Sequence, residues 1–270
     1  MKILLSFIVL TLLQSSFSFA AELSAEQARK FLKDSGLSEL IDSLPEALEQ
    51  QLNLPRLMAA NAIQQETAKQ AVNVVLNQVD GQKLALSYLT STQIAQGLSG
   101  ALDFLASPVG QRISAEERAA GTPDAQLEMQ AYAMQMATTP PADARITLIQ
   151  DLTVALNADQ VILKLMKGTF YSVLDVTQSL NSELAKGLKV EMDKEWSKME
   201  PVLSEQFSQF MVMGVHYSYR NISDEDLKSY IQFLNTPSGK AYWHTGIDII
   251  DIYLKRFVSM FVQQLSNKSS

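Results

Sequence analysis

The sequence contains no cysteine among its 270 residues, so disulfides and cysteine-bound metal or iron–sulfur centres are excluded. Histidine is nearly absent as well, because His216 and His244 are the only two and they form no His-Glu-x-x-His motif. A zinc site would need both histidines brought together with carboxylates. We therefore expect no metal, no cofactor and no catalytic residue, and a protein held together by its hydrophobic core alone.

The chain also lacks any run of basic residues. It has 22 lysines and arginines against 29 aspartates and glutamates, which gives a formal net charge of −7. An acidic chain without a basic cluster is not expected to bind nucleic acid, nor to adhere by charge to a surface of anionic lipids.

Glycine and proline are scarce, with 11 and 8 copies, and they separate stretches in which apolar residues have helical spacing. The chain is instead rich in alanine, leucine, glutamine, glutamate, lysine and methionine, which are good helix formers. We therefore predict an all-α protein, with helix breaks at Pro45, Pro55 and Pro201 because proline disrupts a helix interior.

The first twenty residues have the pattern of a secretory signal. Lys2 supplies a positive charge, residues 3–13 form an apolar run, and Ser18 and Ala20 are small residues at the two positions that determine cleavage. The run is too short to span a bilayer as a helix of the mature protein, although a retained anchor is the alternative. We expect cleavage after Ala20, export to the periplasm and no transmembrane span after cleavage.

One eight-residue motif occurs twice. Phe-Leu-Ala-Ser-Pro-Val-Gly-Gln begins at residue 104 and Phe-Leu-Asn-Thr-Pro-Ser-Gly-Lys at residue 233, an offset of 129 residues. The matching positions are Phe104, Ser107, Pro108 and Gly110 in the first copy and Phe233, Thr236, Pro237 and Gly239 in the second. Two copies about half a chain apart predict an internal duplication. The alternative is that two unrelated helix pairs are each joined by a Ser/Thr-Pro corner.

The motif has the chemistry of a structural corner between two helices. A serine or threonine followed by proline suits the cap and first position of a helix, where the missing proline N–H costs nothing. A glycine in the first turn weakens a helix, so its expected use is close approach of another backbone.

The second copy, with the residues before it, resembles the bacterial family called domain of unknown function 2059. The resemblance rests on Tyr217, the capped acidic turn over residues 222–227 and the motif over residues 233–240. The first copy is poorer, because it lacks the acidic turn. The resemblance implies an all-helical, exported bacterial protein and brings no activity with it.

The best candidate linker is the Thr-Thr-Pro-Pro-Ala stretch over residues 138–142, which lies between the two copies. We therefore predict a signal peptide over residues 1–20, a first helical repeat over residues 21–138 and a second over residues 142–266. The expected fold is two similar antiparallel helical halves from an internal duplication, with a long apolar helix at the C-terminus.

That final helix is predicted from Pro237 to Leu265. Its charged side chains, Asp248, Asp251 and Lys255, lie on one narrow stripe at steps of three and four residues. So narrow a polar face indicates a helix that is buried in the core or covered by a partner. Charges within the run exclude a membrane span.

Three functions stay open. The first is a non-enzymatic envelope protein that binds another protein, or a second copy of itself, through the last helix. The second is a binding module for a lipid or an apolar small molecule between the helical halves, and its expected aromatic wall is Phe170, Tyr171, Phe207 and Phe210. The third, ranked last, is an enzyme that uses acidic residues such as Asp224 and Glu225, which also suit the first turn of a helix.

Overall fold

The computed structural model describes residues 23–52, 62–91, 95–122, 124–180 and 182–268 of the chain. These residues form helices joined by short connections, and no strand occurs among them. The prediction of an all-α fold is therefore confirmed. The predicted signal peptide, residues 1–20, lies outside the described residues.

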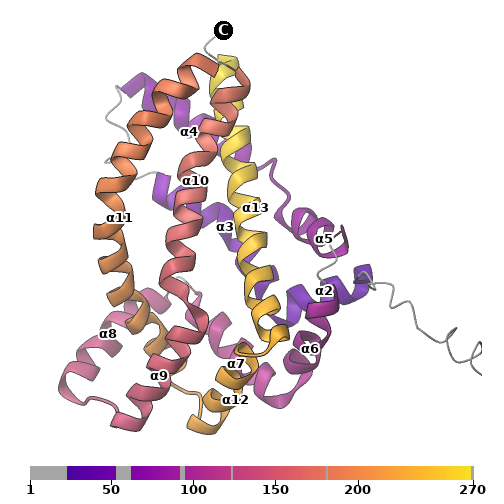
Figure 1. Ribbon diagram of the computed structural model, residues 1–270, viewed down its shortest axis with the longest axis vertical. Coiled ribbons are helices and arrows are strands. Elements are labelled where there is room, and N and C mark those ends of the chain that lie inside the picture. Colours follow the sequence, from indigo (N-terminus) through magenta and orange to yellow (C-terminus); the bar gives the residue numbers. More distant parts are fainter. Residues whose placement is uncertain (1–22, 53–61, 92–94, 123, 181, 269–270) are drawn as a thin grey trace, which may run out of the picture.

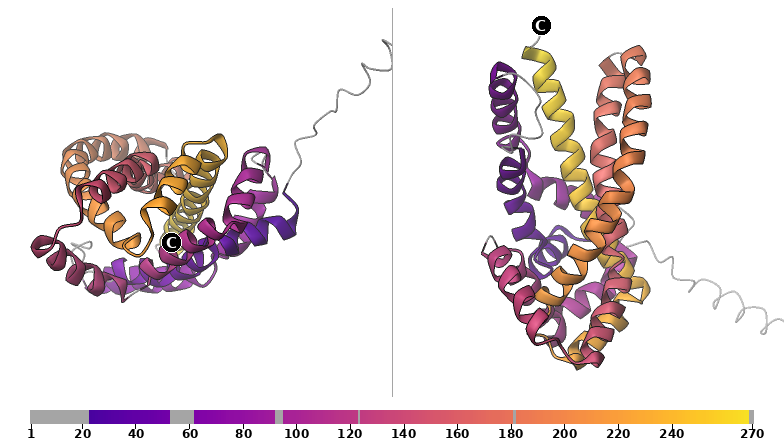
Figure 2. Two further views of the ribbon diagram at one scale, coloured as in Figure 1. Left: turned by 90° about the horizontal axis from the view of Figure 1, so that it is seen from below. Right: turned by 90° about the vertical axis from the view of Figure 1, so that its left-hand side faces the viewer.

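The longest helices run along one axis of the molecule, and shorter helices lie at angles to it (Figure 1). In chain order they are α2 (Ala25–Asp34), α3 (Leu37–Leu52), α4 (Ala62–Leu76), α5 (Gly81–Ser91), α6 (Ala95–Ala106), α7 (Pro108–Ala120), α8 (Ala125–Thr138), α9 (Asp143–Leu156), α10 (Ala158–Leu180), α11 (Ser182–Ser218), α12 (Asp224–Leu234) and α13 (Pro237–Lys268). The long helix α10 lies between α11 and α13, and α6, α7, α9 and α12 gather at one end (Figure 1). Figure 2 shows α3 and α4 on the other side of α13 from the α10–α11 pair.

Two of the predicted helix breaks are wrong. Helix α3 continues through Pro45 and α11 continues through Pro201. A proline inside a helix costs roughly 3 kcal/mol. In α3 the turns around Pro45 are held by apolar packing, because Ile41 is buried and Leu44 and Leu48 pack against a buried cluster. Tertiary contacts outweigh the local preference there, and Pro55 lies outside the described residues.

Within the part of the chain that the structure describes, buried side chains form two clusters, and α13 contributes to both. The first cluster includes Phe31, Leu98, Ile113, Ile149, Leu227 and Tyr242. The second lies between α4 and α13 and includes Val72, Val75, Tyr253 and Phe257. Because the first cluster takes side chains from both predicted halves, the two halves share a core.

The first copy of the motif forms a corner between α6 and α7. The Ser107 hydroxyl donates a hydrogen bond to the Phe104 carbonyl oxygen at 2.6 Å and accepts one from the Gly110 N–H at 3.0 Å. Pro108 is the first residue of α7. The serine therefore ends one helix and caps the next.

The second copy forms the same corner between α12 and α13. The Thr236 hydroxyl donates to the Phe233 carbonyl oxygen at 2.6 Å and accepts from the Gly239 N–H at 3.0 Å. Pro237 is the first residue of α13. The two corners thus have the same two side-chain hydrogen bonds at the same distances.

Each corner also brings its glycine against the end of the preceding helix. A Cβ atom on Gly110 would overlap the carbonyl group of Phe104, whose carbon would lie 2.8 Å away. A Cβ atom on Gly239 would overlap the carbonyl group of Phe233, whose carbon would lie 2.6 Å away. Both positions therefore need a residue without a side chain.

The two corners pack against each other through their phenylalanines. The rings of Phe104 and Phe233 are stacked, with centroids 4.0 Å apart and planes 2° from parallel. Tyr230 and Tyr242 lie beside Phe233, with ring centroids 6.5 Å and 5.9 Å from it. Aromatic contact therefore joins one half of the chain to the other.

The helices on the two sides of this stack contact each other at equivalent positions, which are related by the offset of 129 residues. On one side Arg112 of α7 donates two hydrogen bonds to the Asp226 carboxylate on α12, at 2.7 and 2.8 Å. The corresponding positions on the other side are Ala241 and Gly97, and a Cβ atom on Gly97 would lie 2.8 Å from the Ala241 Cβ. Small residues thus let α6 and α13 approach closely where a charged pair separates α7 from α12.

The repetition is clear for the corners but not for the halves. The helices before the linker, α2 to α8, differ in length and order from those after it, α9 to α13. An internal duplication of whole halves therefore stays a prediction.

The long C-terminal helix α13 is present, as expected. It contacts α4, α5, α6, α10 and α12, and Tyr253 is almost fully buried. Its charged stripe is paired within the chain, because Asp248 accepts a hydrogen bond from the Tyr88 hydroxyl at 2.8 Å and Asp251 pairs with Lys255 at 2.8 Å. The chain itself covers much of the helix, and binding of a partner there stays a prediction.

One stretch of the described chain, Asp143–Thr169, is long and apolar enough to cross a membrane by length and composition alone. It is not one continuous helix, because Asn157 adopts a left-handed conformation with φ 46° and ends α9. Ile149 and Leu152 on α9 are fully buried in the core. The stretch is therefore weak evidence for a membrane span.

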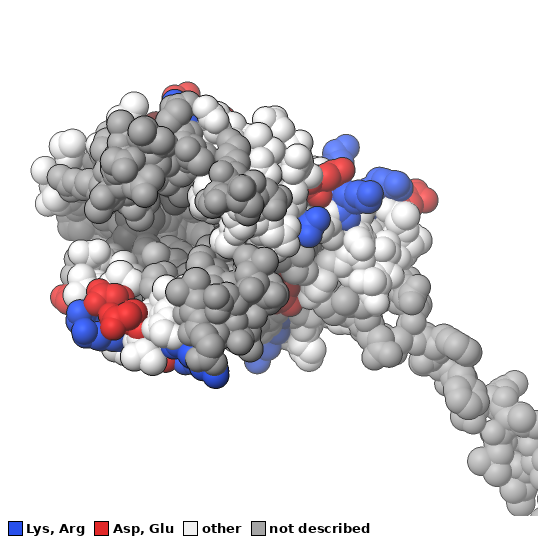
Figure 3. Space-filling model, turned by 90° about the horizontal axis from the view of Figure 1, so that it is seen from above, with Lys and Arg blue, Asp and Glu red and all other residues white. Residues whose placement is uncertain are grey.

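Charged side chains on the described surface form mixed groups. Seen from above, the lysines and arginines lie next to aspartates and glutamates (Figure 3). On α11, for example, Lys189 pairs with Asp193 and Lys198 with Glu195, both at 2.6 Å. Neighbouring charges of opposite sign keep this face from presenting a field of one sign.

Candidate functional site

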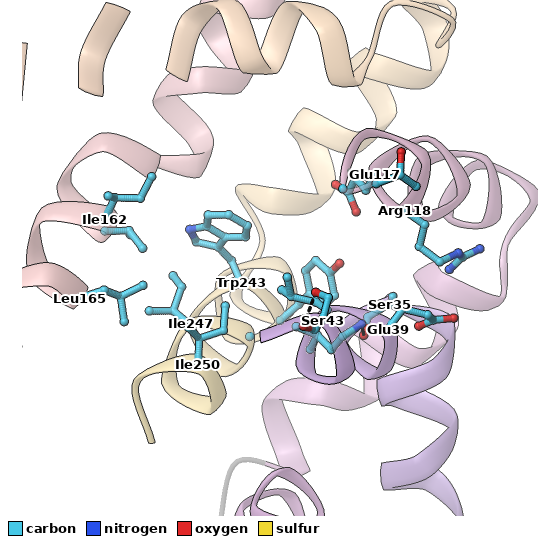
Figure 4. Close-up of a pocket in the computed structure, with 18 of the residues that line it drawn as sticks. Ser35, Glu39, Ser43, Glu117, Arg118, Ile162, Leu165, Trp243, Ile247 and Ile250 are labelled. Carbon is cyan, nitrogen blue, oxygen red and sulfur yellow. Dashed lines mark hydrogen bonds between the residues drawn. The ribbon is translucent and has the colours of Figure 1, made fainter. Parts of the chain in front are cut away.

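A pocket of about 510 Å³ lies where α3, α7, α10 and α13 meet (Figure 4). Small-molecule sites in proteins occupy roughly 300–1,000 Å³. Most of the wall is apolar, and these residues include Leu37, Val161, Ile162, Leu165, Met211, Trp243, Ile247 and Ile250.

The wall is divided into an apolar end and a polar end. In Figure 4 the apolar end is formed by Ile162, Leu165, Ile247 and Ile250, and the polar end by Ser35, Glu39, Ser43, Glu117 and Arg118. The indole of Trp243 lies between them. A molecule that fills the pocket would therefore meet apolar side chains at one end and charged or hydroxyl groups at the other.

The two corners set the direction of the helices that supply this site. Helix α7 starts at the first corner and reaches Glu117 and Arg118 about two and a half turns later. Helix α13 starts at the second corner and reaches Tyr242 and Trp243 within about two turns. The repeated motif thus does not line the pocket as a whole, but it sets where α7 and α13 begin and so where their pocket residues lie.

Three buried tyrosines surround the carboxylate of Glu117. Its Oε1 atom accepts hydrogen bonds from the Tyr219 hydroxyl at 2.6 Å and from the Tyr230 hydroxyl at 2.9 Å. Tyr242 lies close enough for the charges of Glu117 and Arg118 to affect its ionisation. Because Tyr219 directly follows α11 and Tyr230 lies on α12, these two hydrogen bonds tie α7 to both elements.

Burial raises the pKa of Glu117 above its ordinary value, against the hydrogen bonds from Tyr219 and Tyr230 and the charge of Arg118, which favour ionisation. Burial, followed by the Glu117 charge, raises the pKa of Tyr219, Tyr230 and Tyr242 well above the ordinary value. The three hydroxyls therefore keep their protons near neutral pH, and Glu117 is the member of the cluster that takes up a proton first on acidification.

This arrangement predicts how stability depends on pH. The folded protein holds the Glu117 proton up to a higher pH than the unfolded chain does, so protonation of Glu117 favours folding. That contribution is present below the ordinary pKa of about 4.3 and is lost as the pH rises through the folded pKa. We compare the free energy of unfolding of the wild type with that of Glu117→Gln. The wild-type value minus the variant value should become larger as the pH is lowered from about 7.5 to about 4.5.

Urea melts of both proteins across this range measure the difference. Glutamine does not ionise, so the difference isolates the titration of Glu117 from that of groups far from it, and the three tyrosines stay protonated throughout this range. A difference that is flat, or that decreases on acidification, would contradict the burial of an ionisable Glu117.

The two histidines do not meet. His216 is buried in α11, where burial lowers its pKa, and His244 is exposed on α13 with its Nδ1 atom 2.8 Å from the Lys240 carbonyl oxygen. Within the described ranges no group of three or more His, Asp or Glu residues is placed to hold a metal ion.

The acidic turn singled out from the sequence lies at the start of α12 and is engaged in ion pairs. Asp224 pairs with Arg145 of α9 at 2.7 Å, and Asp226 pairs with Arg112 of α7. The turn therefore holds α12 against its neighbours and lies outside the pocket wall.

The aromatic wall expected from the sequence is not the wall of this pocket. The Tyr171 hydroxyl donates a hydrogen bond to the Asp193 carboxylate at 2.7 Å, and Tyr171 does not line the pocket. The side chains of Phe170, Phe207 and Phe210 lie outside the described residues. The aromatic residues that do line it are Tyr242 and Trp243, which follow the second corner.

Comparisons with protein-family models, with curated proteins and with solved structures find no match to this chain. The resemblance to the domain of unknown function 2059 family therefore stays an expectation. Function has to be argued from the geometry of the pocket.

Proposed function

We propose that the protein binds a lipid or another apolar small molecule in the pocket between α3, α7, α10 and α13. The observation that supports the proposal is the pocket itself, because about 510 Å³ of mostly apolar space with a few polar groups at one end is typical of ligand sites. Protein interiors are close-packed and leave few voids larger than a water molecule. A space of this size is therefore well suited to an occupant.

The proposed role is binding without catalysis, in the periplasm of a bacterium. The signal pattern of residues 1–20 supports export, and the resemblance of residues 217–240 to an exported helical family agrees with it. The acidic pair considered for an enzyme begins α12, where Asp224 is bound to Arg145.

Trp243 provides a reporter for binding. The chain has two tryptophans, and Trp196 lies outside the pocket wall with its Nε1–H bonded to Glu200 at 2.7 Å. The variant Trp196→Phe therefore leaves one indole, in the pocket. We expect the neutral dye N-phenyl-1-naphthylamine to accept fluorescence energy from Trp243 and to bind saturably.

A matched pair of substitutions locates the dye. Leu165→Gln places an amide without a partner at the apolar end and should weaken dye binding about tenfold or more. Val190→Gln makes a similar change on α11 at a side chain that is 65% exposed, and should bind the dye as the wild type does. Equal binding by the two variants, or no saturable binding to the wild type, would contradict the proposal.

The second candidate function is a protein-interaction module, the first of the three functions that the sequence leaves open. Helix α8 exposes Leu127 and Met134, which are 71% and 70% accessible and lie seven residues apart on one face. Large apolar side chains exposed in this way favour contact with another protein. Capture of a partner that is lost with Leu127→Ser and Met134→Ser, but not with Leu165→Gln, would support this candidate over the first.

A further inference from the structure

The polar end of the pocket holds hydrogen-bond donors that have no acceptor. The Arg118 guanidinium lines the pocket and makes no ion pair or hydrogen bond with any residue that the structure describes. The same holds for the Tyr242 hydroxyl. The Trp243 Nε1–H is buried without a partner, and an indole can only donate. Arg118 is only half-buried, so among these donors the indole N–H is the one that burial penalises most, and a ligand that brings an acceptor stabilises it.

Arg118 is fixed in this position by the turn between α2 and α3. Gly36 has a left-handed φ of 76°, and a Cβ atom there would lie 2.9 Å from the Arg118 Cγ. The aliphatic part of Arg118 therefore packs over the bare glycine backbone. Figure 4 shows its guanidinium on the same side of the pocket as Ser35 and Glu39, away from Ile162 and Leu165.

We propose that the ligand is an amphiphile with an anionic head, a carboxylate or a phosphate, which Arg118 and Tyr242 bind while the apolar chain lies between α10 and α13. This inference rests on the proposed function, because it names the class of molecule that the same pocket takes. A guanidinium matches both heads well, since it can donate two parallel hydrogen bonds to two oxygens of either.

Two carboxylates also line the pocket and set how strongly an anion is held. Glu39 is exposed at the rim, where water screens its charge. Glu117 is held by Tyr219 and Tyr230 through Oε1 alone, so its charge opposes an anionic head. Because burial raises the pKa of Glu117, that opposition falls on acidification. As long as the head itself stays ionised, binding of an anionic amphiphile should therefore tighten as the pH is lowered.

The test measures displacement of the neutral dye from Trp196→Phe protein by four amphiphiles with the same chain. These are dodecanoate, dodecyl phosphate, dodecanol and dodecylamine, each kept below the concentration at which it forms micelles. We expect at least one of the two anions to bind about 10–100-fold more tightly than dodecanol, the range of a charge-assisted hydrogen bond. Preference for dodecanoate indicates a fatty-acid head, and preference for dodecyl phosphate a phosphate head.

Substitutions test which side chains cause the tighter binding of anions. Arg118→Gln should bring the anions to the affinity of dodecanol without changing dodecanol itself. Arg112→Gln removes the same charge from the same helix outside the pocket, and should keep the full preference. Tyr242→Phe keeps the ring in the core and should reduce the preference several-fold. Urea melts of each variant confirm that the fold is retained.

Some outcomes would overturn the inference and leave the proposed function intact. They are equal binding of anions and dodecanol, tighter binding of dodecylamine, and a preference for anions that survives Arg118→Gln. Absence of saturable dye binding to the Trp196→Phe protein would instead overturn the proposed function. The two failures are therefore distinguishable in one set of titrations.

Discussion

Replacing Gly239 with alanine should lower the free energy of unfolding by about 3 kcal/mol, although alanine is the better helix former. A Cβ atom at this position would lie 2.6 Å from the Phe233 carbonyl carbon and closer still to its oxygen. The neighbour is backbone at the end of α12, held by the Thr236 cap, so it does not move aside cheaply. The corner must open, or its hydrogen bonds must break.

Gly110→Ala should show a similar but smaller loss. The Phe104 carbonyl carbon would lie 2.8 Å from the new Cβ, slightly further than at the second corner. Urea melts of both variants measure the two losses in the same way.

Gly187 gives the matched control, because it is exposed on α11 and a Cβ there would have nothing within 4 Å. Gly187→Ala should stabilise the protein by roughly 0.5–1 kcal/mol, the usual gain at an open helical position. The sign of the change thus separates a packed glycine from a free one. If Gly239→Ala and Gly110→Ala also gained stability, the shared glycines would reflect ancestry and not packing.

The corners could be predicted from the sequence because their chemistry is local. A capping hydroxyl, a proline and a glycine within five residues define the hydrogen bonds that Ser107 and Thr236 make, whatever surrounds them. The same locality explains the wrong breaks at Pro45 and Pro201. A proline predicts a break through its own backbone geometry, whereas the contacts that keep α3 helical come from side chains of α4 and α13, far away in the sequence.

The pocket could not be predicted, because its wall is assembled from residues far apart in the chain. Ser35 and Ile250 are both part of it, with Glu117 and Leu165 between them in sequence. Helix α3 contributes four of the lining residues, α10 three and α13 five, at the same helical steps that core residues have, so no spacing within a helix distinguishes a pocket residue from a core residue. The sequence does not mark Glu117 as a pocket residue either, since an acidic residue beside an arginine is ordinary on a helix surface.

Replacing Phe233 with alanine should cost about 3–5 kcal/mol, because its ring is 9% exposed and lies at the centre of the aromatic contact between the corners. Phe104→Ala should cost less, since Phe104 is only partly buried. The two rings are stacked at 4.0 Å, so the losses should not add. We expect the double variant to be about 0.5–1.5 kcal/mol less destabilised than the sum of the single variants.

Urea melts of the two single variants and the double variant measure this coupling. The control cycle uses Phe31 and Phe257, which belong to separate buried clusters and have different ring partners, so their losses should add to within about 0.5 kcal/mol. A coupling of the same small size for Phe104 and Phe233 would mean that each ring only fills its own corner. A clear coupling would mean that the two halves stabilise each other where both present the same residue of the same motif.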